Sequence, residues 1–140
     1  MKFPVVLSIE GKQSYMDQDP EVLELVTEGV MEQIDGGWNL SYEESDLTGL
    51  QGVTTTFRIR PNEVVLDRTG KLTSQMIFVE GQKHDSLYQM EFGALMLSVC
   101  ATRVSYDLTE AGGTVDLSYR IEIEQTSAGV IDYHLEIRKK

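Results

Sequence analysis

Alternating apolar and polar residues dominate the second half of the chain and constrain its fold more than any other feature. In residues 115–123 and 131–138, every odd position is apolar and every even position is polar. The pattern recurs in residues 53–60, where Thr55 interrupts the apolar set. A period of two residues places one set on each face of a β-strand, so these segments are predicted to be half-buried strands.

Turn sequences separate these runs. Each of them carries Gly, Pro, Asn or Asp, the residues with which a backbone reverses most easily. They are DGGW (35–38), RPNE (60–63), RTGK (68–71), VEGQKHD (79–85) and TEAGGT (109–114). Strands that follow one another every 8–12 residues or so indicate an antiparallel sandwich or barrel. We expect strands near 3–10, 22–34, 38–44, 52–60, 63–68, 72–80, 84–92, 94–107, 114–125 and 129–138.

Residues 19–37 fit two interpretations. Asp19 is a suitable cap for a helix that starts at Pro20, and apolar residues recur every four positions thereafter. Apolar and small residues also alternate with glutamates, and Gly29 would cost about 1 kcal/mol inside a helix. A DGG turn that follows fits a hairpin. The residues favour a strand over 22–34 and leave the helix open.

Composition narrows the class of protein. At 140 residues, with 41% apolar and 25% charged residues, the chain is predicted to form a single globular domain, residues 1–140. Its formal net charge of −11 disfavours nucleic acid and anionic membranes as partners, because both require a positive surface. The single cysteine excludes an internal disulfide framework and any metal site built from several cysteines.

We expect neither export nor membrane insertion. Its start, MKFPVVLSIEG, has an apolar run of about five residues, shorter than the ~7–15-residue core of a secretory signal. No stretch approaches the roughly 18 apolar residues of a spanning helix. We expect a soluble cytoplasmic protein.

The segment GALMLSVCATRVSY (93–106) is apolar on both faces of its predicted strand. A barrel strand with one face in water needs only one apolar face, so another element or a second subunit should cover the outer one. We expect a homodimer in which the outer-facing Met96, Cys100 and Val104 form the interface. The competing interpretation is that MKFPVV, at the start of the chain, folds over this stripe.

Several short motifs occur in the order found in a known family. They are TEG (27–29), YEES.LTG..G.TTT (42–56), SQM.F..G.KH (74–84), Tyr88 and FG.L (92–95), where a dot stands for any residue. Over roughly residues 5–125 the chain resembles the YwiB-like family of uncharacterised bacterial proteins. The resemblance implies an all-β fold: a calycin-like antiparallel barrel of eight to ten strands with little helix, related to lipocalins and fatty-acid-binding proteins. It also implies a strand over 22–34, and it assigns no activity, because fold kinship alone does not carry function.

Polar residues on the inner faces of the predicted strands are candidates for ligand contacts. Thr55 and Ser74 interrupt apolar faces, and Glu44 ends the apolar stripe that begins at Trp38. An eight-stranded barrel is just wide enough to be filled by side chains or to hold one small ligand, which such groups would orient. Hydroxyls bonded locally within a filled core are the alternative. The predicted lining is Trp38, Tyr42, Glu44, Thr55, Ser74, Met76, His84 and Tyr88.

The histidines and acidic residues give little support to catalysis or a metal centre. His134 shares its face with acidic residues and is expected in water, while His84 is expected at a turn near the rim of the interior. Glu43 and Glu44 are adjacent, so on a strand they point to opposite faces and do not form a catalytic pair. The sequence has no HxH or HExxH spacing, and we expect no metal and no cofactor.

The Gly-rich stretch at residues 45–52 is interpreted as an exposed hairpin connection, not as a catalytic loop. Taken together, the sequence predicts a non-catalytic module that binds a small hydrophobic or amphipathic molecule. One alternative is a protein–protein interaction domain with a filled barrel core. The other is an enzyme that uses Glu44 or His84 as acid or base.

Overall fold

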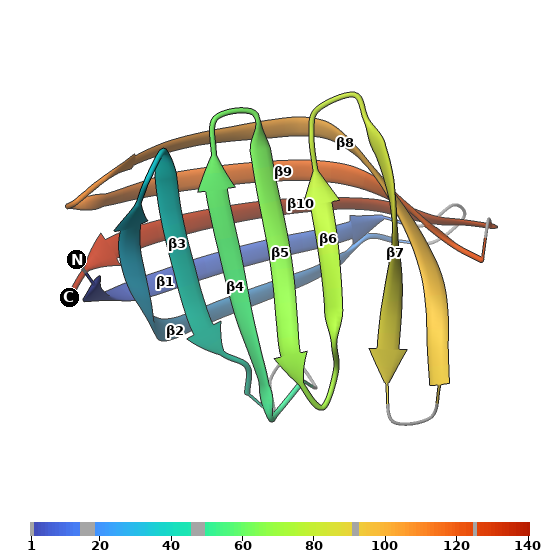
Figure 1. Cartoon of the computed structure of the whole chain (residues 1–140), viewed down its shortest axis with the longest axis horizontal. Coiled ribbons are helices and arrows are strands. Elements are labelled where there is room, and N and C mark those ends of the chain that lie inside the picture. Colours follow the sequence, from blue (N-terminus) through green and yellow to red (C-terminus); the bar gives the residue numbers. More distant parts are fainter. Residues whose placement is uncertain (1, 15–18, 46–49, 91–92, 125) are drawn as a thin grey trace.

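The computed structural model describes residues 2–14, 19–45, 50–90, 93–124 and 126–140, and in this part of the chain every regular element is a β-strand (Figure 1). The prediction of an all-β fold with little helix is confirmed. Within the same residues, no helix is long and apolar enough to cross a membrane. The strands are β1 (Lys2–Ser14), β2 (Glu21–Ile34), β3 (Gly37–Glu43), β4 (Val53–Arg60), β5 (Glu63–Gly70), β6 (Ser74–Phe78), β7 (Lys83–Met90), β8 (Gly93–Thr109), β9 (Gly112–Ile123) and β10 (Thr126–Lys139).

These strands form one antiparallel sheet in the order β6-β5-β4-β3-β2-β1-β10-β9-β8-β7. The two ends of the sheet meet at Thr73 and Gln89, whose backbones exchange hydrogen bonds of 3.0 and 2.9 Å. A sheet that meets itself in this way is a nearly closed barrel, and closure leaves few unpaired groups at strand edges. The predicted barrel is confirmed.

The barrel is flattened into two layers that cross each other. In Figure 1, β3–β6 stand steeply in front of the long strands β1, β2, β9 and β10. β2 belongs to both layers, because it pairs with β1 along residues 21–32 and with β3 along residues 30–34. A Cβ atom at Gly29 would lie 2.5 Å from the carbonyl oxygen of Ser41, so glycine lets β3 pass this closely. Residues 22–34 are strand, and Gly29 marks the place where the layers divide.

Alternation along the strands places the apolar core inside the barrel. Odd-numbered residues of β9, such as Leu117 and Tyr119, are buried in this core. Their polar neighbours lie outside, where charged groups pair across strands, as Arg58 on β4 does with Asp67 on β5. The largest fully buried side chains include Tyr119, Phe57, Phe78, Leu7, Met31 and Leu40.

A β-bulge in β8 turns one residue of the expected dimer face toward the core. The register of β8 against β9 shifts between Ala101 and Arg103, which adds one residue to β8. Odd-numbered residues face inward before the bulge, and even-numbered residues face inward after it. Val104 therefore packs against the core, and its expected place on the outer face beside Met96 and Cys100 is wrong.

The rest of the outer face of β8 is only partly apolar. Met96 is 41% exposed, Cys100 is half-buried, and Ser98 between them donates a 2.6 Å hydrogen bond to Asp85 of β7. The MKFPVV segment does not cover this face, because its residues from Lys2 onward belong to β1. The homodimer stays a prediction.

The connection from β3 to β4 spans residues 44–52, of which 46–49 lie outside the described residues. The expectation of an exposed hairpin at Asp46, Thr48 and Gly49 therefore falls outside the described part of the chain. On either side, Ser45 and Gly52 are exposed, and the backbone of Glu44 donates a 2.8 Å hydrogen bond to Val53. The described ends of the connection thus keep β3 and β4 paired.

Candidate functional site

A row of polar side chains crosses the inner face of the front layer. Strand pairing sets Tyr42 of β3 opposite Thr55 of β4, Thr55 opposite Arg68 of β5, and Arg68 opposite Ser74 of β6. Directly paired residues in a sheet point to the same face, so the four side chains are neighbours. Glu44, two residues after Tyr42, faces the same way. We call these residues the polar cluster: Tyr42, Glu44, Thr55, Arg68 and Ser74.

Glu44 is the acidic centre of the polar cluster. Its side chain is 2% exposed, although Glu43 beside it is exposed, as strand alternation requires. The Thr55 hydroxyl donates a 2.6 Å hydrogen bond to Glu44 Oε2. Burying a carboxylate is costly unless donors or cations surround it, and Thr55 and Arg68 supply one of each.

Tyr42 is held in its neutral form. Burial raises the pKa of the Tyr42 phenol well above its ordinary value, and the negative charge of Glu44 raises it further. Among the described residues, Glu44 Oε1 has no hydrogen-bond partner. The Thr55 hydroxyl is therefore the direct donor to this carboxylate, and Tyr42 is its neutral neighbour.

Arg68 is buried but not fully bonded. Its side chain is 12% exposed, and its Nε lies 4.0 Å from Glu44 Oε2, which is too long for a hydrogen bond. Within the described residues, neither Arg68 Nε nor the buried Ser74 Oγ has a hydrogen-bond partner. Arginine is not deprotonated in proteins, so this side of the cluster holds a permanent charge with unused donor capacity.

A cavity of about 340 Å³ opens beside Arg68 inside the barrel. Strands from both layers contribute to its walls, and those walls are mainly aliphatic and aromatic. Of the described residues that line it, Arg68 is the one with a charge. The lining residues are Gln13, Arg68, Met76, Tyr88, Leu95, Leu97, Tyr119, Ile121, Ile123, Ile131 and Tyr133.

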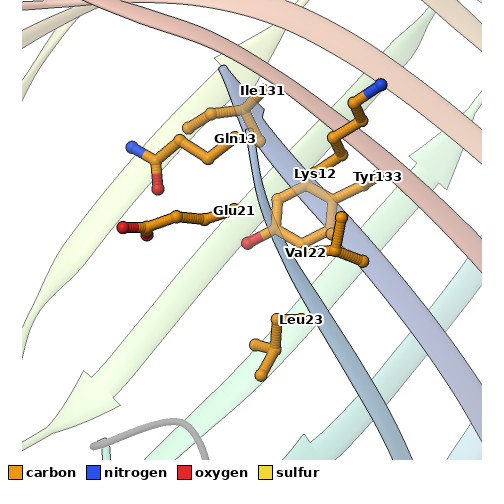
Figure 2. Close-up of a pocket in the computed structure, with 8 residues that line it drawn as sticks. Lys12, Gln13, Glu21, Val22, Leu23, Ile131 and Tyr133 are labelled. Atoms are coloured by element: carbon orange, nitrogen blue, oxygen red, sulfur yellow. The ribbon is translucent and has the colours of Figure 1, made fainter. Parts of the chain in front are cut away.

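An outer hollow of about 550 Å³ adjoins this cavity and shares Gln13, Ile131 and Tyr133 with it. Figure 2 shows the Tyr133 ring at the centre of this hollow. The side chains of Gln13 and Glu21 extend to one side of it, and Lys12 extends to the other. The hollow lies where β1 ends and β2 begins, at the end of the barrel.

Aromatic rings separate the cavity from the closed part of the core. The Tyr119 ring centroid lies 4.6 Å from that of Phe78 and 6.4 Å from that of Tyr133. Tyr133 can lie across β1 because Gly11 has no side chain: a Cβ there would be 3.2 Å from the ring. Tyr119 and Tyr133 line the cavity, and Phe78 packs against Tyr119 in the core.

The structure brings together most of the predicted lining residues. Tyr42, Glu44, Thr55 and Ser74 belong to the polar cluster, while Met76 and Tyr88 line the cavity itself. The local bonding considered for the hydroxyls holds for Thr55 and does not hold for Ser74.

Two predicted residues lie outside this arrangement. Trp38 is buried opposite Ile59, four residues before Tyr42 along β3, and does not line the cavity. His84 of β7 is opposite Val99 of β8, and its Nε2 is buried without a hydrogen-bond partner among the described residues. It does not line the cavity either. Neither side chain contributes to the cavity wall.

His134 takes no part in the cavity or the polar cluster. His134 lies on the outer face, where its Nδ1 is 2.6 Å from Asp116 Oδ1 and its Nε2 is 3.3 Å from Glu136 Oε1. Its imidazole therefore shares no contact with the interior carboxylate of Glu44. Among the residues that the structure describes, no cluster of three His, Cys, Asp or Glu side chains is suited to a metal ion.

Sequence reasoning missed Arg68 and the aliphatic walls of the cavity. Arg68 falls in the RTGK segment, which was interpreted as a turn, whereas β5 continues to Gly70. Its parity with Val64 and Leu66 was the available signal, since it places a cation on an apolar face. The parity of Ile121 and Ile131 identified inward residues, but nothing in the sequence separates a cavity wall from a packed core.

Comparisons with known proteins agree with one another. Residues 7–137 match the model of a domain of unknown function, DUF1934. The chain is 31% identical over 108 residues to the uncharacterized beta-barrel protein YwiB of Bacillus subtilis (strain 168), covering 76% of this chain and 74% of that protein. The crystal structure of the ywiB protein from Bacillus subtilis superposes with a TM-score of 0.88 at 25% identity, covering 99% of this chain and 93% of that one.

Proposed function

This chain belongs to the DUF1934 family of β-barrel proteins, and on that premise we propose that it is a small-molecule binding module whose site is the cavity beside Arg68. The observation that carries the proposal is the combination of a cavity of about 340 Å³, apolar walls and one buried cation. Ligand sites typically occupy about 300–1,000 Å³ and combine mainly apolar walls with a few polar groups that fix orientation.

Apolar residues near the open end of the barrel support the proposal. Ile123 lines the cavity and is 37% exposed, and Leu23 lines the outer hollow and is 43% exposed. Both share the inward parity of their strands, so they are core-type residues that the barrel does not bury. Exposed apolar surface around a concave site is typical of ligand-binding grooves.

The arrangement favours binding over catalysis. The cavity walls carry no histidine, cysteine or carboxylate among the described residues. Glu44 does not line the cavity and accepts a hydrogen bond from Thr55, which leaves it poorly placed to exchange protons with a bound molecule. Tyr42, held neutral by its raised pKa, does not line the cavity either.

Native mass spectrometry tests the proposed function. Protein purified without detergent should carry a small-molecule adduct, or acquire one from an apolar ligand panel. Ile121→Trp should abolish the adduct, because a larger side chain fills the cavity. Val26→Trp is the matched control, since Val26 is 68% exposed on the outer face of β2.

The proposal is overturned if folded wild-type protein carries no adduct and binds no member of the panel. It is also overturned if Ile121→Trp and Val26→Trp bind equally well. Circular dichroism of both variants establishes that each is folded before binding is compared.

A further inference from the structure

We propose that the cavity takes a carboxylate amphiphile, with its anionic head bonded to Arg68 and its unbranched apolar tail along the β8–β9 wall; this inference rests on the proposed function. Arg68 lies at the polar end of the cavity, and Leu95, Ile121 and Ile123 form aliphatic wall. A ligand with one anionic end and one apolar end matches both surfaces at once.

The guanidinium of Arg68 has the donors for such a head group. Arginine presents a planar fork of N–H groups that matches a carboxylate bidentately. The 4.0 Å separation from Glu44 Oε2 leaves that fork without a short bond to its acidic neighbour. Arg68 lines the cavity, and its Nε is buried without a hydrogen-bond partner among the described residues.

Glu44 does not occupy the position of the ligand carboxylate. Its Oε2 accepts the hydrogen bond from Thr55, and Glu44 is not among the residues that line the cavity. The Thr55 donor stabilises part of its charge, which weakens its hold on Arg68. Removing the charge of Glu44 should therefore strengthen the binding of an anion at Arg68.

The size of the cavity limits the tail. A water molecule's share of liquid volume is about 30 Å³, so 340 Å³ accommodates roughly ten non-hydrogen atoms. A fatty acid with about eight carbons fits this volume. Longer tails would leave through the hollow that contains Gln13 and Leu23.

Isothermal titration calorimetry with octanoate and 1-octanol tests the inference. Wild-type protein should bind octanoate at least tenfold more tightly than 1-octanol at pH 7. The double variant Arg68→Met/Glu44→Gln removes both buried charges together, so no uncompensated carboxylate remains to unfold the barrel. It should lose at least tenfold in octanoate affinity and keep its affinity for 1-octanol within threefold.

Two further variants sharpen the test. Glu44→Gln alone should raise octanoate affinity threefold or more, because the repulsion from the neighbouring carboxylate is gone. Arg58→Met is the matched control: Arg58 lies on the adjacent strand and pairs with Asp67 on the outer face, so its loss should leave both affinities unchanged.

The two proposals fail in distinguishable ways. If 1-octanol binds and octanoate gains nothing from Arg68, the carboxylate inference is overturned while the binding function stands. If folded protein binds neither compound nor any member of the panel, both proposals are overturned. Equal loss of octanoate binding in Arg58→Met would assign the effect to net charge and would also overturn the inference.

Discussion

The same four strands build two different interiors. At one end of the front layer, paired residues across β3–β6 are apolar in two successive rows, and at the other end the next row is polar. The first apolar row closes the barrel, the second reaches the cavity wall at Met76, and the polar row reaches it at Arg68. The rows are Trp38–Ile59–Val64–Phe78, Leu40–Phe57–Leu66–Met76 and Tyr42–Thr55–Arg68–Ser74.

This difference separates the rows that stabilise the fold from the row that contributes to the proposed site. The first two rows remove large side chains from water, which is the dominant stabilising contribution in a domain of this size. The third row holds the cation Arg68, and the carboxylate of Glu44 lies two residues beyond Tyr42 in the same interior, so both are buried at a cost in desolvation. The polar row therefore contributes less hydrophobic burial than the two apolar rows, although its hydrogen bond to Glu44 still contributes to stability.

The largest expected effect is in the second apolar row. Leu66 is fully buried between Phe57 and Met76. Leu66→Ala should lower the free energy of unfolding by about 2–5 kcal/mol, because it loses burial and leaves a cavity. Urea denaturation followed by circular dichroism measures this, and a loss below about 1 kcal/mol would mean that this end of the barrel is not tightly packed.

An intermediate effect is expected in the polar row. Thr55→Val keeps the shape of the side chain and removes the donor to Glu44. The free energy of unfolding should fall by about 1.5–3 kcal/mol, the usual contribution of a hydrogen bond to a charged group. The same urea experiment applies, and an unchanged midpoint would show that Glu44 does not depend on this hydroxyl.

A smaller effect is expected at the cavity wall. Leu95 is half-buried and already borders open space in the cavity. Leu95→Ala therefore removes fewer contacts than Leu66→Ala does. The loss should stay below about 1 kcal/mol. A loss equal to that of Leu66→Ala would remove the distinction between packed and hollow ends.

The smallest effect is expected at His134 on the outer surface, away from both regions. Its hydrogen bond to Asp116 raises the pKa of His134 above its ordinary value of 6.5, and the contact with Glu136 adds to this despite partial burial. A raised folded-state pKa contributes stability that is present below the unfolded pKa and is lost as pH rises through the folded pKa.

His134→Gln should therefore destabilise the protein more at pH 5.5 than at pH 8.5. The difference should be at most about 1 kcal/mol, because the imidazole is 41% exposed and solvent screens the pair. Thermal unfolding at the two pH values measures it. A larger loss at pH 8.5 would contradict the assignment of the shift to the acidic neighbours.

Alternation and turn chemistry predict the strands because both are local. All the expected strands are present, including the ambiguous 22–34, where Gly29 is explained by the close passage of β3. The face of Val104 could not be predicted, since a β-bulge changes parity without a sequence marker that parity analysis detects.

Part of the polar cluster was predicted because strand parity is a local signal too. Thr55 and Ser74 are visible as interruptions of apolar faces, and Glu44 as the end of an apolar stripe. Arg68 was hidden because the end of β5 resembles a turn. The cavity depends on how two layers cross, which is a property of tertiary packing and not of any one strand.

Methyl nuclear magnetic resonance during titration with octanoate tests the central claim most directly, because it reports both ends of the barrel in one experiment. The methyl signals of Leu95, Ile121 and Ile131 should shift, while those of Ile59 and Val64 in the closed end should not. Shifts confined to outer-face residues such as Val26, or spread equally over both ends, would contradict a ligand site beside Arg68.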